Sequence, residues 1–347
     1  MRTKTTILSL VLILIAAIAL CSCNLDATDG IYSEIADSTE GTSVTLKAYL
    51  GQYNNEYYYL TDKSVCRTAG NNQSKTVFSS TETETVLGAS LLDSETGALL
   101  VLRRKNGPFK PSISYYATPQ ADAVELGQFN ELLTNGLFFD DSKIYRCNAG
   151  AAAAVVSDIS VQYYLVSGDY AFFSVKDSSS NTKFYVIKSD GSILFNIAGS
   201  SMKYAGFQPL PGGTDFILLN YDDSKAKANL YLLANGDTEV TTSVYAKLKS
   251  SIQYPKSTQS ASFSYTEDDK TYVVFKCNSY FDRVRIADDE SDRSVTPIST
   301  GFAVNLRTAD ITNILGTDTA NVFIAGTVSS MLYRINMNEN KPATPIK

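Results

Sequence analysis

The chain has 347 residues, a net charge of −6 at pH 7, and neither His nor Trp. The absence of His excludes a His-containing catalytic triad on this chain and removes the commonest general base and zinc ligand. The acidic balance excludes nucleic acid and anionic lipid surfaces as favoured partners, because both select a basic protein face.

The first residues have the layout of a secretory signal peptide. Arg2 and Lys4 precede an uncharged apolar run from Ile7 to Leu20, and a small-residue segment follows it. This run is shorter than the roughly 20 residues that cross a bilayer as a helix. We therefore expect a cleaved signal peptide over residues 1–22, and its removal would change the net charge from −6 to −8.

The residues that follow, Leu20-Cys21-Ser22-Cys23, resemble the lipobox of bacterial lipoproteins. The resemblance implies that Cys23 is lipidated and becomes the mature N-terminus, with diacylglycerol on the thiol and an acyl chain on the new α-amine. Two or more acyl chains make membrane attachment durable. Asn24 favours the outer membrane by the rule known for enteric lipoproteins. We expect a protein of the bacterial cell envelope, lipid-anchored, with residues 23–41 as a polar tether.

The other cysteines are Cys66, Cys147 and Cys277. Their odd number and wide separation argue against a disulfide framework, even in a compartment that permits one. We expect them to be small buried residues without a reactive role.

Beyond the tether, short β-branched and aromatic runs alternate with Gly, Asn, Asp and Ser. Helical periodicity is weak, and its best instances are residues 120–133 and 151–156. Evenly spaced strands separated by turn residues indicate a β-sandwich, a barrel or a propeller.

A unit of four strands, which we name A to D in chain order, repeats along this part of the chain. In residues 203–243 the predicted strands are 203–210, 215–221, 229–234 and 238–243. Seven such units can be aligned, and their B strands are predicted to begin near residues 57, 98, 137, 170, 215, 271 and 321. The mean step is about 44 residues, which is the period of a propeller blade.

One four-stranded sheet cannot bury either of its faces alone, whereas sheets stacked around an axis cover each other. We therefore predict an all-β fold, a β-propeller of seven four-stranded blades over residues 42–347. Six or eight blades, or a pair of β-sandwich domains, are the alternatives. Strand B is the most apolar strand of most units and is expected to be the most buried.

In a propeller, the A–B and C–D turns share one face, and the B–C and D–A connections share the other. The C–D turns predicted at 105–107, 189–191 and 235–237 have hairpin-turn residues and need no further function. The Asp residues predicted in B–C connections are Asp62, Asp140, Asp141, Asp177, Asp222, Asp223 and Asp282.

These carboxylates would attract a basic partner or hold a cation, because like charges on one face raise the local potential. Asp is also a common and solubilising turn residue, so their turn role is the competing interpretation. The chain has no Asp-x-Asp-x-Asp-Gly calcium loop. We expect no cofactor, with Ca²⁺ on this face as the alternative.

Together these features favour a lipid-anchored envelope propeller that binds another envelope protein and does no chemistry. In layout the chain resembles the propeller lipoprotein of the bacterial outer-membrane barrel-assembly machinery, whose blades carry Trp-containing motifs that this chain lacks. The alternative is a propeller hydrolase or carbohydrate-binding protein that uses the acids of the B–C connections.

Overall fold

A computed structural model of the chain describes residues 45–69, 74–222, 227–250, 262–277, 281–298, 311–317, 321–326, 332–336 and 344–345. The predicted signal peptide, lipidation site and tether lie outside these residues, as does Asp223. Val44–Lys347 form one compact unit. Among the residues described, no helix has the length and apolar character needed to cross a membrane.

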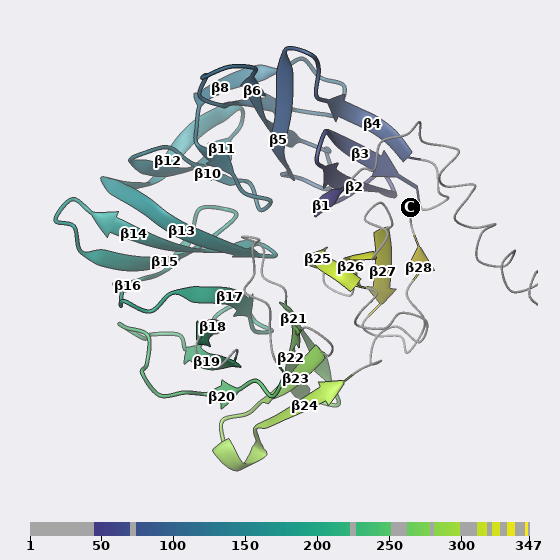
Figure 1. Ribbon diagram of the computed structural model, residues 1–347. Helices are drawn as coiled ribbons and strands as arrows, with labels where there is room; N and C mark the ends of the chain where they lie inside the picture. The colour runs from purple at the N-terminus through teal and green to yellow at the C-terminus, as the bar shows by residue number, and fades with distance from the viewer. Residues whose placement is uncertain are drawn as a thin grey trace, which may run out of the picture. The chain divides into compact units, whose positions relative to one another are not determined.

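The described chain is built of strands, with one 3₁₀ turn at Glu290–Asp292. The strands form seven four-stranded antiparallel sheets, and each sheet takes four strands that are consecutive in the chain (Figure 1). We number these sheets 1 to 7 in chain order and keep the letters A to D for the strands of each.

Sheet 1 contains β1 (Leu46–Tyr53), β2 (Glu56–Thr61), β3 (Ser64–Thr68) and β4 (Ser74–Ser79). Sheet 2 contains β5 (Glu84–Leu91), β6 (Leu99–Lys105), β7 (Ser112–Tyr116) and β8 (Val124–Gln128). Sheet 3 contains β9 (Glu131–Leu132), β10 (Leu137–Phe139), β11 (Lys143–Asn148) and β12 (Ala151–Ser157). Sheet 4 contains β13 (Ile159–Ser167), β14 (Tyr170–Asp177), β15 (Thr182–Lys188) and β16 (Ile193–Ala198).

Sheet 5 contains β17 (Tyr204–Pro209), β18 (Phe216–Asp222), β19 (Lys227–Leu233) and β20 (Ala246–Lys247). Sheet 6 contains β21 (Ser262–Glu267), β22 (Lys270–Lys276), β23 (Phe281–Ile286) and β24 (Ser294–Ile298). Sheet 7 contains β25 (Ile311–Thr317), β26 (Asn321–Gly326), β27 (Leu332–Asn336) and β28 (Thr344–Pro345).

The fold is the predicted β-propeller, and the prediction located its B strands closely. The B strands begin at residues 56, 99, 137, 170, 216, 270 and 321, each within one residue of the predicted start. A pair of β-sandwich domains is excluded, because the strands form separate four-stranded sheets instead of two-sheet domains.

Strand B is buried on both faces, which explains its continuous apolar runs. All three residues of β10 are buried, and β14 has five consecutive buried residues. The D strands are more open: β4 and β8 contain no buried residue.

The A strands of neighbouring sheets approach one another. β1 contacts β5, β5 contacts β9, β13 contacts β17, and β17 contacts β21. This approach leaves little room: a Cβ on Gly88 of β5 would lie 3.4 Å from the Leu132 carbonyl oxygen of β9. Because the A strands of successive sheets contact each other, strand A is the innermost strand of these sheets.

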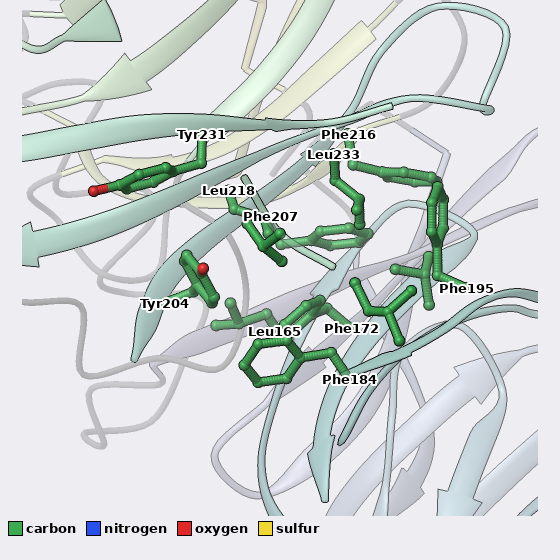
Figure 2. Close-up of a cluster of buried hydrophobic side chains, with 13 residues drawn as sticks. Leu165, Phe172, Phe184, Phe195, Tyr204, Phe207, Phe216, Leu218, Tyr231 and Leu233 are labelled. Atoms are coloured by element: carbon green, nitrogen blue, oxygen red, sulfur yellow. The ribbon is translucent and has the colours of Figure 1, made fainter. Parts of the chain in front are cut away.

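Neighbouring sheets share apolar cores, as the one between sheets 4 and 5 illustrates (Figure 2). The Phe207 and Phe216 rings of sheet 5 are stacked, with centroids 5.1 Å apart. Phe195 of sheet 4 meets Phe216 edge-on, and Phe172 packs against Phe207. Such contacts cover faces that a single sheet would leave in water, and this burial is the main driving force for the stacking.

The inner strands of sheets 4, 5 and 6 are also joined by a buried polar network centred on Gln208 of β17. Its Oε1 accepts hydrogen bonds from Ser167 Oγ of β13 at 3.1 Å and Ser262 Oγ of β21 at 3.0 Å. Its Nε2 donates to Ser264 Oγ and to the Pro209 carbonyl oxygen. The network satisfies polar groups that would otherwise be costly to bury.

The first and last sheets pack together, although they lie at opposite ends of the chain. β1 contacts β25 (Figure 1), and Leu315 and Leu332 of sheet 7 join the core of sheet 1. The Arg334 guanidinium donates a hydrogen bond to the Tyr57 hydroxyl and lies over its ring.

Two predicted details are wrong. The turn at 105–107 joins strands B and C of sheet 2, not C and D, because strand D of that sheet lies farther on, at β8. Strand D of sheet 5 is β20 instead of the predicted segment 238–243. That segment pairs with sheet 4 through a bridge between Glu239 and Ala198, and its Val240 is buried in the core between sheets 4 and 5. The stretches with weak helical periodicity, by contrast, contribute strands β8, β9 and β12, as the all-β prediction requires.

Candidate functional site

We name the B–C and D–A connections the loop face, and the A–B and C–D connections the turn face. Asp62, Asp140 and Asp141 lie in B–C connections as predicted, and Asp177 and Asp222 end the B strands β14 and β18. These residues therefore belong to the loop face or its border.

Asp140 is the most extensively bonded of the loop-face acids. Its Oδ1 accepts hydrogen bonds from the Ser142 and Lys143 backbone N–H groups, both at 2.8 Å, and its Oδ2 accepts one from the Tyr145 hydroxyl at 2.7 Å. Burial alone would raise the pKa of Asp140, but these hydrogen bonds outweigh burial and hold the pKa below its ordinary value. The Asp140 carboxylate therefore stabilises the turn in which it lies.

Asp62 and Asp177 also accept hydrogen bonds from backbone N–H groups. Asp62 Oδ1 accepts from the Thr45 backbone N–H at 3.3 Å. Asp177 Oδ1 accepts from the backbone N–H groups of Asn181 and Ser179, both at 2.9 Å, and the Asn181 hydrogen bond is the main cause of its lowered pKa. The Asp177 contacts support the turn role of Asp, whereas the Asp62 contact ties its connection to Thr45, before β1.

Asp141 differs because its side chain is 81% exposed. Its carboxylate accepts hydrogen bonds from Asn130 Nδ2 at 2.7 Å and from Lys110 Nζ at 3.0 Å, and these two partners lower its pKa. Lys110 belongs to the B–C connection of sheet 2, so the pair joins the loops of two neighbouring sheets.

Asp282 was predicted in a B–C connection and is instead the second residue of β23, with 0% exposure. Its Oδ2 accepts from the Lys249 and Ser250 backbone N–H groups at 2.6 and 2.8 Å, and its Oδ1 accepts from Ser250 Oγ. It therefore fastens the segment after β20 to sheet 6 and offers no surface to a partner.

The loop face is close to charge balance over the described residues. Its connections carry five acids and four bases there, not counting the strand ends Asp177 and Asp222. No group of three or more Cys, Asp or Glu side chains with metal-binding geometry occurs within the described ranges. Calcium binding by this face stays a prediction.

Phe109 was missed by the sequence reasoning, although it is the most exposed large hydrophobic side chain of the described residues, at 55%. It lies on the loop face, in the connection between β6 and β7 that Lys110 ties to Asp141. Pro108 and Pro111 restrict the backbone on both sides, and its ring lies over Gly107, where an added Cβ would be 3.1 Å away. The sequence signal was an aromatic residue enclosed by two prolines.

Glu131, at the start of β9, was also missed. Burial raises the pKa of this carboxyl group, while the Tyr164 hydroxyl and the Lys47 ammonium act in the opposite direction. Tyr164 belongs to strand A of sheet 4 and Lys47 to strand A of sheet 1. No motif marks this residue, because its neighbours come from distant parts of the chain.

Cys66, Cys147 and Cys277 are free thiols, as predicted. Cys66 and Cys277 are buried and Cys147 is half-buried. Burial raises the pKa of Cys277 to about 12 and raises that of Cys147. A thiol with a raised pKa is a weak nucleophile at neutral pH, so none of these observations favours a reactive role.

No protein-family model matches the chain, and no curated protein matches it. Several solved structures are similar to the chain. Oligopeptidase B from Leishmania major matches with a TM-score of 0.52 and 10% identity, over 93% of this chain and 52% of its own. A puromycin hydrolase matches with a TM-score of 0.53 and 9% identity, over 88% of this chain and 54% of its own.

KlAtg21, in a complex with the coiled coil of AgAtg16, matches with a TM-score of 0.50 and 12% identity, over 88% of this chain and 98% of its own. The chain spans about half the length of the two enzymes and nearly all of KlAtg21. At these identities the likenesses show the fold alone.

Proposed function

We propose that the protein is a lipid-anchored propeller of the bacterial cell envelope that binds another envelope protein through its loop face and does no chemistry of its own. The lipobox-like residues that end in Cys23 support the anchor. The propeller supports the binding role, because it holds surface loops on a rigid frame of packed sheets.

The observation that carries the binding proposal is Phe109. A large aromatic ring that is 55% exposed gains much by burial against a partner, and aromatic residues dominate the energetic centres of protein interfaces. The ion pair between Lys110 and Asp141 and the flanking prolines restrain the loop in the free protein. A restrained loop loses less conformational entropy on binding.

Two observations favour binding over catalysis. The chain has no His, and the carboxylates of Asp140 and Asp177 are occupied by hydrogen bonds within their own turns. A propeller of similar extent occurs in a complex with a coiled coil in the KlAtg21 structure, which is consistent with a protein partner.

The anchor is tested by labelling cells with a radioactive fatty acid and fractionating their membranes. The wild-type protein should carry label and sediment with outer membranes, whereas Cys23→Ala should lose the label and the membrane association. Continued labelling of the variant would place the lipid on another residue, with Cys21→Ala as the next variant to examine.

Binding is tested by purifying the mature protein from detergent-solubilised envelopes and identifying stoichiometric companions. Phe109→Ala should reduce recovery of the companion at least tenfold, while Val124→Ala, which truncates a 49% exposed side chain at the start of β8 and outside the loop face, should not. If no companion is found and the protein hydrolyses or retains envelope polysaccharide, the scaffold proposal is wrong and the enzyme or carbohydrate-binding alternative replaces it.

A further inference from the structure

Exposed aliphatic side chains lie on the outer part of sheets 4 and 5, away from the loop face. Ile193 and Leu194, the first two residues of β16, are 44% and 40% exposed, and Val244, just before β20, is 36% exposed. Ile193 and Leu194 directly follow the C–D turn of sheet 4. Exposed apolar side chains of this kind can contribute to an interaction surface.

The turn face of sheets 4, 5 and 6 is strongly acidic. Its A–B and C–D connections carry ten acids, not counting Glu239, which pairs with Ala198 farther along β16. Six of these acids are on sheet 6: Asp268, Asp269, Asp288, Asp289, Glu290 and Asp292, all exposed. The one base in these connections, Arg293, lies over the Tyr245 ring at 4.0 Å and donates to the Ala287 and Asp288 carbonyl oxygens.

Turn propensity does not explain this excess. Both faces are built of turns, yet the described loop-face connections of the whole chain carry five acids against four bases. Some turn-face acids do cap turns, as Asp190 and Asp289 show. Among the described residues, however, no hydrogen bond or ion pair engages the carboxylates of Asp268, Asp269 or Asp288, so their charges are available to a partner.

We infer that the turn face of sheets 4–6 docks a polypeptide segment in which Lys or Arg side chains are interspersed with apolar ones. The acids would attract the cations, and Ile193, Leu194 and Val244 would receive the apolar side chains. Nucleic acid and anionic lipid carry the wrong charge, and a second copy of this chain would bring a further net charge of −6. The inference is independent of the proposed function, which uses the opposite face.

The test measures binding of a fluorescent amphipathic Lys/Leu peptide to the detergent-solubilised mature protein by anisotropy at low salt. The turn-face variant combines Asp268→Asn, Asp269→Asn, Asp288→Asn and Glu290→Gln. Asn is suited to the positive φ of residues 268 and 269, which are 49° and 58°. The control variant removes four acids from the loop face, Asp62→Asn, Glu82→Gln, Asp141→Asn and Asp158→Asn, and so changes the net charge equally.

The turn-face variant should bind the peptide about tenfold more weakly, and the control variant less than twofold, because each exposed charge pair contributes modestly and only at short range. Replacing Ile193 and Leu194 with Ser should weaken binding of the Lys/Leu peptide but not of a Lys/Ser peptide of equal charge. Equal weakening by both charge variants, or no binding by the wild type, would overturn the inference. Circular dichroism checks that each variant is folded.

Discussion

At the scale of single residues, aspartates that look alike in the sequence have different roles. Asp140 holds its own turn, Asp141 joins two loops, and Asp282 is a buried fastener between sheets 5 and 6. The difference comes from what surrounds each carboxylate. A carboxylate that accepts several N–H or O–H groups is stabilised in its charged form, and its removal leaves those donors without a partner.

Asp140→Asn is expected to lower the free energy of unfolding at pH 7 by about 1 kcal/mol, because the amide cannot replace both carboxylate oxygens as acceptors. The folded pKa of Asp140 lies below its ordinary value, so its stabilisation is present above the unfolded pKa, about 3.9, and is lost as the pH falls through the folded pKa. The gap between wild type and variant should therefore close in acid.

Urea unfolding between pH 7 and pH 3 measures this gap. Asp288→Asn is the matched control, since Asp288 is exposed and no hydrogen bond among the described residues engages its carboxylate; it should match the wild type at every pH. A gap for Asp140→Asn that stays constant down to pH 3 would show that the carboxylate charge does not stabilise the fold.

At the scale of the strands, the A strands connect one sheet to the next. They approach closely at Gly88, and they carry buried polar side chains such as Gln208 and Ser167 among apolar ones. Buried polar networks restrict the ways in which strands can pack, because each donor needs a particular acceptor. The B strands contribute mainly apolar burial.

Gln208→Met retains the volume of the side chain but removes the acceptor for Ser167 Oγ and Ser262 Oγ. We expect a loss of about 2 kcal/mol in the free energy of unfolding, measured by urea denaturation. Gln162→Met on β13 is the control, because Gln162 is exposed and, among the described residues, hydrogen-bonds to Ser160 of its own strand alone. A loss below about 0.5 kcal/mol, the usual size for surface substitutions, would mean that the network does not hold the inner strands.

At the scale of the whole molecule, sheet 1 and sheet 7 complete each other. Leu315 and Leu332 fill the core beside Tyr49 and Tyr57, and Arg334 contacts Tyr57. The Arg334–Tyr57 contact joins residues 277 positions apart in the chain, so loop closure makes it slow to form. Stability at this junction should therefore be shared between the two ends of the chain.

Arg334→Ala is expected to increase amide hydrogen exchange in β1 and β2 by roughly tenfold, because the substitution removes a charge-assisted hydrogen bond and a cation–π contact. Strands of sheet 4 should exchange as in the wild type. Arg104→Ala, an exposed Arg on β6, is the control. Faster exchange in sheet 4, or no change in β1 and β2, would contradict the shared stability.

The sequence by itself determined the all-β class, the four-strand repeat and the start of each B strand, because turn residues and apolar runs act over a few neighbouring positions. It also predicted the free cysteines. Only the tertiary structure decided that strand A is innermost, that strand D of sheet 5 is displaced to β20, and that Asp282 is buried. It also located Phe109 on the loop face and the acidic excess on the turn face. Each of these features depends on residues of other sheets that pack against it. The local sequence pattern does not show which distant segments of the chain will pack together.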